Sequence, residues 1–347
     1  MIDFELPAQD SREYILSSGR PAVLYGMGNG ADMVLDDFIR RGIPVAGVTA
    51  SDEFVRGQAF RGFEVKKLSE FTGDFILAVC FGSGRKEVID RIISLSRQYD
   101  LIFPVVPVYG DEIFDRDFVN RNEDKINAAR ELFSGRSREV YDNCIRFMFS
   151  GRLPYLLDAT SEKEEAFENI LRLTGSERYL DLGAYTGDTV SEFLRFSGGS
   201  YSHITAVEAD AKNYSRLVSS CSSLRKFTAI NAAISDETGF VGFSGRAGRN
   251  SSLGGEKAVK ALRTDDITDG APFTYIKADI EGAEAAMLRT ANETLIKYKP
   301  KLNIALYHRS ADIFELPLMI KSINPGYRFE LRRHPYIPCW DMNLYCV

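Results

Sequence analysis

The chain has 347 residues, of which 44% are hydrophobic and 27% charged, a composition typical of a soluble globular protein with length for two domains. Its 43 basic residues against 49 acidic ones give a net charge of -6, which argues against nucleic acid or an anionic membrane as a partner. The opening residues lack a secretory signal pattern, and no apolar run approaches the ~18 residues of a membrane helix, so we expect a cytoplasmic protein.

Residues 1–110 alternate short apolar runs with amphipathic helical patterns, which is typical of a parallel α/β unit. Strands are expected in AVLYGMGNG (22–30), IPVAGVTA (43–50), FILAVCFGS (75–83) and LIFPVVPVY (101–109), and helices in DMVLDDFIRRG (32–42) and KEVIDRIISLSRQY (86–99). We therefore predict a Rossmann-like N-terminal domain.

The first glycine-rich loop matches G-x-G-x-x-G/A through Gly26, Gly28 and Ala31, between an expected strand and an expected helix. A dinucleotide site requires that context. However, the next strand ends with Thr49 where a ribose-binding carboxylate is expected, and Asp52 lies beyond it. The loop is either a nucleotide site or a structural turn, and its ligand stays open.

Residues 111–175 carry helix-period apolar positions among charges, in NRNEDKINAARELF (120–133) and SREVYDNCIRFMF (137–149), which predicts a helical connector. The α/β alternation resumes over residues 176–347. Strands are expected in RYLDLG (178–183), HITAVEA (203–209), FTAINAAI (227–234), FTYIKADI (273–280), KLNIALYH (301–308), YRFELRR (327–333) and NLYCV (343–347). The last two follow one another without a helix, which predicts an antiparallel pair at one sheet edge.

A second glycine-rich loop follows the strand at 178–183 and has the pattern D-x-G-x-x-x-G, from Asp181 through Gly183 to Gly187. A carboxylate beside a pyrophosphate would repel it, whereas it would attract the ammonium and sulfonium of S-adenosylmethionine. The glycines allow close approach of backbone to ligand. We assign this loop, with Tyr185 on it, to binding of that cofactor.

Two further residues complete the expected cofactor site. Glu208 lies twenty-seven residues after Asp181, at the end of the next strand, where a carboxylate can accept hydrogen bonds from both ribose hydroxyls. Asn231, after the third strand, is assigned to the adenine, although a plain turn explains it equally well.

Five separated motifs, in order, make the C-terminal half similar to the FkbM family of S-adenosylmethionine-dependent methyltransferases. They are YLDLGAYTGDT, AVEAD, NAAISD, YIKADIEGAEAAMLRTANETLIKYKPKLNIALYHR and DIFELPLMIKSINPGYRFELRRH. The resemblance implies a class I methyltransferase fold of seven strands, the last antiparallel. It also implies methyl transfer mostly to hydroxyl groups of sugars, polyketides or similar small molecules.

The same resemblance places Lys277, Asp279, Glu281 and Gly282 on the family's K-x-D-x-E-G-x-E signature and His308 on the YH after the fifth strand. His308 is the expected general base, because the ordinary pKa of histidine lies near working pH. A structural histidine that caps the strand is the alternative.

Asp279 and Glu281 are expected to orient the acceptor or to act as base. With His308 these carboxylates form a possible site for a hard divalent ion, but hydrogen bonding explains them as well, and no metal is assigned. Lys277 is as compatible with a structural salt bridge as with a direct role.

Residues 244–258 are rich in glycine and serine and lack apolar periodicity, which predicts either a lid over the acceptor or an ordinary disordered loop. Arg246 and Arg249 in this segment would attract an acidic or phosphorylated acceptor.

The sequence thus favours an O-methyltransferase with a small-molecule or glycan acceptor and a possible homodimeric state. Two alternatives remain. One is an NAD(P)-dependent or nucleotide-sugar enzyme that uses the first glycine-rich loop. The other is a non-catalytic protein that binds S-adenosylmethionine.

Overall fold

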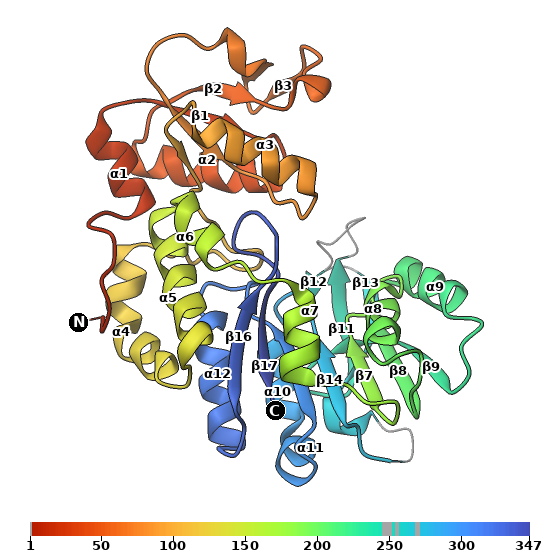
Figure 1. Ribbon diagram of the computed structural model, residues 1–347. Coiled ribbons are helices and arrows are strands. Elements are labelled where there is room, and N and C mark those ends of the chain that lie inside the picture. Colours follow the sequence, from red (N-terminus) through yellow and green to blue (C-terminus); the bar gives the residue numbers. More distant parts are fainter. Residues whose placement is uncertain (1, 245–251, 254–256, 268–270) are drawn as a thin grey trace. The chain divides into compact units, whose positions relative to one another are not determined.

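The computed structural model describes residues 2–244, 252–253, 257–267 and 271–347 (Figure 1). Its contacts divide the chain into two compact units, Met1–Ser161 with Arg333–Asp341 and Glu162–Arg332 with Met342–Val347. We call them the N-terminal and the C-terminal unit. Much of the segment expected to be a connector, up to residue 161, thus lies in the N-terminal unit.

The N-terminal unit contains a mainly parallel sheet, as the alternating pattern predicts. Its strand order is β3-β4-β2-β1-β5-β6, with β1 at Ala22–Tyr25, β2 at Val45–Thr49, β3 at Ala59–Phe60, β4 at Phe63–Lys66, β5 at Ile76–Val79 and β6 at Leu101–Ile102. Only β3 pairs in the antiparallel sense, with β4. The helices between these strands are α1 (Ser11–Ser18), α2 (Asn29–Arg41) and α3 (Lys86–Ser96).

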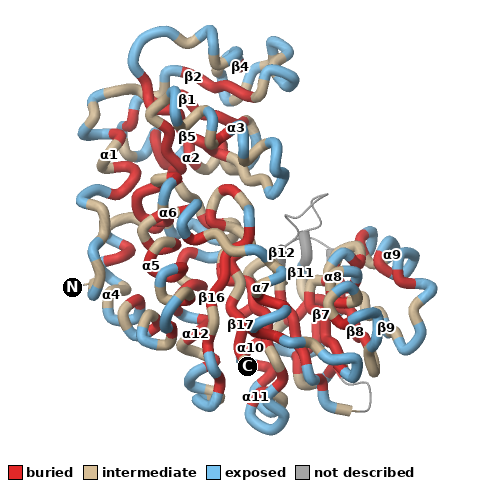
Figure 2. Tube along the Cα trace, in the orientation of Figure 1, coloured by how far each residue is buried: buried red, intermediate tan, exposed pale blue. Residues whose placement is uncertain are grey.

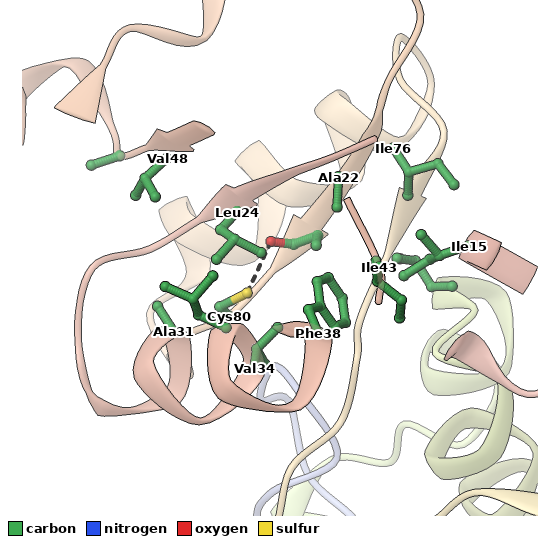
Figure 3. Packing of buried hydrophobic residues seen from close by; sticks show 14 of the residues in the cluster. Ile15, Ala22, Leu24, Ala31, Val34, Phe38, Ile43, Val48, Ile76 and Cys80 are labelled. Atoms are coloured by element: carbon green, nitrogen blue, oxygen red, sulfur yellow. Dashed lines mark hydrogen bonds between the residues drawn. The ribbon is translucent and has the colours of Figure 1, made fainter. Parts of the chain in front are cut away.

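Helix α2 shows how local sequence builds this unit. It ends at Gly42, which has φ 70°, a left-handed conformation that glycine adopts without strain. Arg40 and Arg41 in its last turn complement the helix dipole. Its apolar side is buried, and Figure 3 shows Val34 and Phe38 in one cluster with Leu24 of β1.

Three helices of the N-terminal unit fall in the region where the sequence predicts helices. They are α4 (Arg116–Arg130), α5 (Gly135–Ser150) and α6 (Leu153–Asp158). Arg130 donates two hydrogen bonds to Asp142, at 2.7 and 2.8 Å, which joins α4 to α5. The short helix α7 (Lys163–Glu165) and the π-helical turn η3 (Ala166–Leu171) open the C-terminal unit.

The C-terminal unit contains a seven-stranded sheet with the order β16-β17-β15-β14-β7-β8-β9. The strands are β7 (Arg178–Leu182), β8 (His203–Glu208), β9 (Phe227–Asn231), β14 (Tyr275–Ala278), β15 (Lys301–Ala305), β16 (Phe329–Arg333) and β17 (Met342–Cys346). β17 runs antiparallel to β15, whereas β14 pairs in parallel with β7 and β15. This arrangement agrees with the class I methyltransferase fold that the resemblance implies.

Helices of the C-terminal unit follow its strands. They are α8 (Asp188–Phe196), α9 (Ala211–Ser220), α10 (Glu284–Thr290), α11 (Asn292–Lys297) and α12 (Asp312–Ile323). Stacked rings of Tyr179, Phe193 and Tyr275 join α8 to the sheet. Figure 2 shows the central strands as buried segments, and every residue of β14 is buried. Because β7 and β14 are adjacent but far apart in the chain, the strand order reverses between them, where ligands of such folds bind.

A small second sheet has the order β10-β13-β11-β12, with β10 at Ala233–Ile234, β11 at Gly239–Ser244, β12 at Ser252–Leu253 and β13 at Lys257–Leu262. The sequence analysis did not expect a second sheet, although β10 falls within the strand expected at 227–234, because glycines interrupt the apolar residues of β11 (GFVGFS) and lysines those of β13 (KAVKAL). Most of the segment predicted to be a lid or loop, including Arg246 and Arg249, lies outside the described residues. Among the helices of the described part, none is long and apolar enough to cross a membrane.

Candidate active site

The second glycine-rich loop connects β7 to α8 at the carboxyl edge of the sheet. Gly183 has φ 79° and Gly187 has φ 95°, both in the left-handed region that favours glycine. A Cβ atom at Gly183 would lie 1.9 Å from the backbone oxygen of Asp279, so the loop is pressed against the chain that leaves β14. Tyr185, with φ 48°, takes the same conformation without being glycine.

Asp181 is completely buried at the end of β7. It lies opposite Lys277 of β14, whose Nζ is 3.3 Å from the Asp181 Oδ1 atom, and Thr189 donates a hydrogen bond of 2.5 Å to Oδ2. Lys277 also donates to the backbone oxygen of Gly183, at 2.9 Å. Although burial acts to lower the pKa of Lys277, the charges of Asp181 and Asp279 raise it. Asp181 therefore fixes the start of the loop through Lys277 and Thr189.

Glu208 lies at the end of β8 with 8% of its surface exposed. One carboxylate oxygen accepts from the backbone N–H of Tyr185 at 2.9 Å, and the other accepts from the N–H of Asp210 at 2.8 Å. Burial raises the pKa of Glu208. Asn231, opposite Glu208 on β9, donates to the backbone oxygens of Glu208 and Ala209, at 2.8 and 3.1 Å. Both side chains hold the loops of this edge in place.

Glu208 retains the acceptor capacity that binding of a nucleoside requires. Each oxygen of Glu208 has one backbone donor, and a carboxylate has about four acceptor positions in all, so sites remain for ribose hydroxyls. At Gly183 and Gly187 an added Cβ would lie against the backbone oxygen of Asp279 and against the side chains of Ser220 and Cys221, so packing within the protein requires both glycines.

A cluster of acidic side chains surrounds His308, next to this loop. The His308 Nε2 atom lies 3.3 Å from Asp279 Oδ1 and 3.5 Å from Glu281 Oε2, and Nδ1 lies 2.9 Å from Glu284 Oε1. Asp279 and Glu281 follow β14, Glu284 begins α10 and His308 follows β15. The fold thus brings His308, Asp279 and Glu281 together, as the sequence analysis expects of one sheet edge.

The members of this cluster differ in exposure. The side chains of Asp279 and Glu281 are 38% and 28% exposed, whereas those of His308 and Glu284 are 1% exposed. Burial acts to lower the pKa of His308, but Glu284 and Asp279 raise it well above its ordinary value. Burial acts to raise the pKa of Asp279, but hydrogen bonding by His308 and the charge of Lys277 lower it. The exposed carboxylates are therefore the groups that a substrate would meet first.

Sequence reasoning missed three contributors. Glu284 contacts His308 and also accepts from the backbone N–H of Ile280 at 2.8 Å, and Tyr307 donates its hydroxyl to Asp279 at 3.0 Å. Burial and the charge of Glu284 raise the pKa of Asp312 to about 7. A signal for Glu284 was present, since it is the last acid of the motif KADIEGAE. No sequence motif indicated a role for Asp312, the first residue of α12.

The first glycine-rich loop belongs to the N-terminal unit and packs tightly there. A Cβ atom at Gly30 would lie 2.5 Å from the backbone oxygen of Cys80, and one at Gly26 would lie 3.3 Å from the ring of Phe81. Thr49, at the position expected for a ribose-binding acid, is completely buried. The backbone contact excludes a side chain at Gly30, and the φ of 131° favours glycine at Gly26, but neither observation identifies a ligand.

Comparison with known proteins identifies a domain in the C-terminal unit. Residues 181–329 match the family described as Methyltransferase FkbM domain. The C-terminal unit carries an FkbM methyltransferase domain. The FkbM domain is an S-adenosylmethionine-dependent methyltransferase, and its matched range contains the glycine-rich loop, Glu208 and the cluster around His308.

One solved structure agrees with this fold over nearly the whole chain, and others are similar to about half of it. The crystal structure of a methyltransferase FkbM from Methylobacillus flagellatus KT has a TM-score of 0.74 and 21% identity, covering 99% of this chain and 94% of that chain. Fibrillarin from Aeropyrum pernix in complex with S-adenosyl-L-methionine has a TM-score of 0.33 at 17% identity, covering 50% of this chain and 66% of that chain. A precorrin-6y C5,15-methyltransferase from Geobacter metallireducens GS-15 has a TM-score of 0.34 at 13% identity, covering 54% and 92%. No curated protein sequence matches the chain.

Proposed function

We propose that this FkbM domain methylates a hydroxyl oxygen of a small molecule, sugar or glycan. The observation that carries the proposal is the pair of accessible carboxylates, Asp279 and Glu281, held by buried His308 beside the glycine-rich loop. A hydroxyl acceptor has to be oriented and has to lose a proton, and this group offers acceptors for both purposes. Cytoplasmic location and a possible homodimer stay predictions from the sequence.

The residues around the loop would bind and orient the cofactor. Glu208 is proposed to accept hydrogen bonds from the ribose hydroxyls. Asn231 would hold the backbone of the loop that contacts the adenine, and the backbone of Gly183 would contact the amino acid part of the cofactor. Buried Asp181 would act through Lys277 on that backbone. When bound, S-adenosylmethionine supplies a methyl group on a sulfonium centre, which favours in-line attack by a correctly held oxygen.

The accessible carboxylates of Asp279 and Glu281 would orient the acceptor hydroxyl and accept its proton. As the new bond between the acceptor oxygen and the methyl carbon forms and the bond from that carbon to sulfur breaks, the hydroxyl proton would pass to a carboxylate oxygen of Asp279 or Glu281. His308, which the sequence suggests as the base, lies behind both carboxylates, so we propose that it positions them. This arrangement keeps the proton acceptor within hydrogen-bond reach of the acceptor oxygen.

The test measures formation of S-adenosylhomocysteine with a panel of hydroxylated sugars and small molecules. Asp279→Asn and Glu281→Gln are expected to lower kcat by about 10²-fold to 10⁴-fold, because a positioned acid or base contributes about that much. Calorimetric affinity for S-adenosylhomocysteine should remain unchanged in both variants. Glu208→Gln should instead weaken that affinity.

Glu237→Gln serves as the matched control, because Glu237 is an exposed acid outside this cluster. It should behave as wild type in both assays. Full turnover in both Asp279→Asn and Glu281→Gln would contradict the assigned roles, and methylation confined to nitrogen or carbon acceptors would contradict O-methylation.

A further inference from the structure

The cluster around His308 contains more negative than positive charge. Asp279, Glu281 and Glu284 all lie within 3.5 Å of one imidazole. Lys277 is a further cation that acts on Asp279. Carboxylates gathered this closely repel one another unless a cation lies between them, and either protonated His308 or a bound metal ion can be that cation.

Two buried atoms of the cluster lack hydrogen-bond partners. In the described part of the chain, neither Nδ1 of His308 nor Oε2 of Glu284 has one, and both side chains are 1% exposed. Nδ1 is 2.9 Å from the other oxygen of Glu284, but their orientation does not make a hydrogen bond. A buried polar atom without a partner costs about 1 to 3 kcal/mol, a cost that a ligand in contact with both atoms would remove.

We propose that Asp279, Glu284 and His308 bind a divalent metal ion. Each offers one donor atom, and these atoms lie within 4.8 Å of one another. Metal bonds of about 2.0 to 2.2 Å to nitrogen and oxygen would require these side chains to move toward a common centre and His308 to bind as a neutral imidazole. The accessible side of Asp279 would leave room for a further ligand at the ion.

The donor set indicates which ions fit. Carboxylate oxygens favour Mg²⁺ and Mn²⁺, whereas imidazole favours Zn²⁺, Fe²⁺ and similar ions. Two carboxylates with one imidazole are therefore suited to Mn²⁺, Fe²⁺ or Zn²⁺. The chain has no thiol in this cluster, so a site of the zinc-finger type does not apply.

The role of the ion rests on the proposed function, whereas its binding does not. An acceptor hydroxyl coordinated to the ion would have a lower pKa, so its proton would leave more readily to Glu281 or to water. The oxygen would then form its bond to the methyl carbon while the bond from that carbon to sulfur breaks. No oxidant or reductant is needed.

The test uses the full-length protein, stripped with a chelator and titrated with MnCl₂, and follows the electron paramagnetic resonance signal of free Mn²⁺. Wild type is expected to bind one Mn²⁺ per chain. Glu284→Gln and His308→Gln are expected to weaken binding by at least about tenfold, because each removes a ligand. Glu237→Gln should bind as wild type.

Folding of each variant is checked by its affinity for S-adenosylhomocysteine, so that loss of Mn²⁺ binding is not mistaken for unfolding. His308→Gln provides a second test if Glu284→Gln does not fold, since Glu284 also holds the backbone of Ile280. Absence of Mn²⁺ binding in wild type, or wild-type affinity for Mn²⁺ in both variants, would overturn the metal site. Mn²⁺ binding without hydroxyl methylation would support the site and overturn the proposed function instead.

Discussion

At Gly183, backbone conformation and available space both exclude a side chain. Its φ is 79°, and an added Cβ would meet the backbone oxygen of Asp279 at 1.9 Å, where no flexible side chain can move aside. Gly199 has a similar φ of 74° but no atom within 4 Å of such a Cβ. Substitution of Gly199 therefore tests the cost of the left-handed backbone conformation alone, whereas substitution of Gly183 adds the cost of the contact with Asp279.

Gly199→Ala is expected to lower the free energy of unfolding by about 1 to 2 kcal/mol, the cost of a left-handed conformation. Gly183→Ala should lower it by at least about 3 kcal/mol, because overpacking is added. It should also weaken binding of S-adenosylhomocysteine. Urea unfolding and calorimetry measure both effects, and equal losses in the two variants would show that the contact with Asp279 is unimportant.

Single residues also show where sequence reasoning stops. The position of His308 after a strand was visible, but its burial behind two carboxylates depends on how the segments 279–284 and 306–310 pack. The carboxylate of Asp181 was placed at the mouth of the loop, yet its orientation toward Lys277 follows from pairing between β7 and β14. Its role toward the cofactor stays a proposal.

At the scale of elements, β17 is a buried inner strand of the seven-stranded sheet. It lies between β15 and β16, and Leu344 is completely buried opposite Ile304 of β15. Leu344→Ala is expected to lower the free energy of unfolding by about 2 to 5 kcal/mol, because it leaves a cavity in the core.

Ile296 in α11 is the matched control, since 58% of it is exposed. Ile296→Ala should change stability by no more than about 0.5 kcal/mol. Both variants can be compared by urea unfolding followed by tyrosine fluorescence. A loss at Leu344 as small as that at Ile296 would mean that β17 contributes little to the sheet.

At the scale of the whole molecule, each unit has its own hydrophobic core. Phe38 belongs to the core of the N-terminal unit, whereas Tyr179 and Phe193 belong to that of the C-terminal unit. The segment Arg333–Asp341, which connects β16 to β17, is assigned to the N-terminal unit. We expect thermal unfolding to show two transitions.

S-adenosylhomocysteine at 100 times its dissociation constant should stabilise only the transition of the C-terminal unit, by about 2.7 kcal/mol. Phe38→Ala should destabilise only the transition of the N-terminal unit, by about 3 to 5 kcal/mol. Differential scanning calorimetry distinguishes these outcomes. A single transition that ligand and variant both shift would show that the units unfold together.

The sequence by itself determined the alternation of strands and helices, the two glycine-rich turns and the family of the C-terminal half. These follow from local periodicity, from the conformational freedom of glycine and from motifs in a fixed order. Only the tertiary structure decided the neighbours of each side chain, because contacts among Asp279, Glu284 and His308 join separate elements. It also decided that Gly183 must lie against Asp279 and that residues 333–341 belong with the N-terminal unit, since packing between distant segments leaves no local pattern.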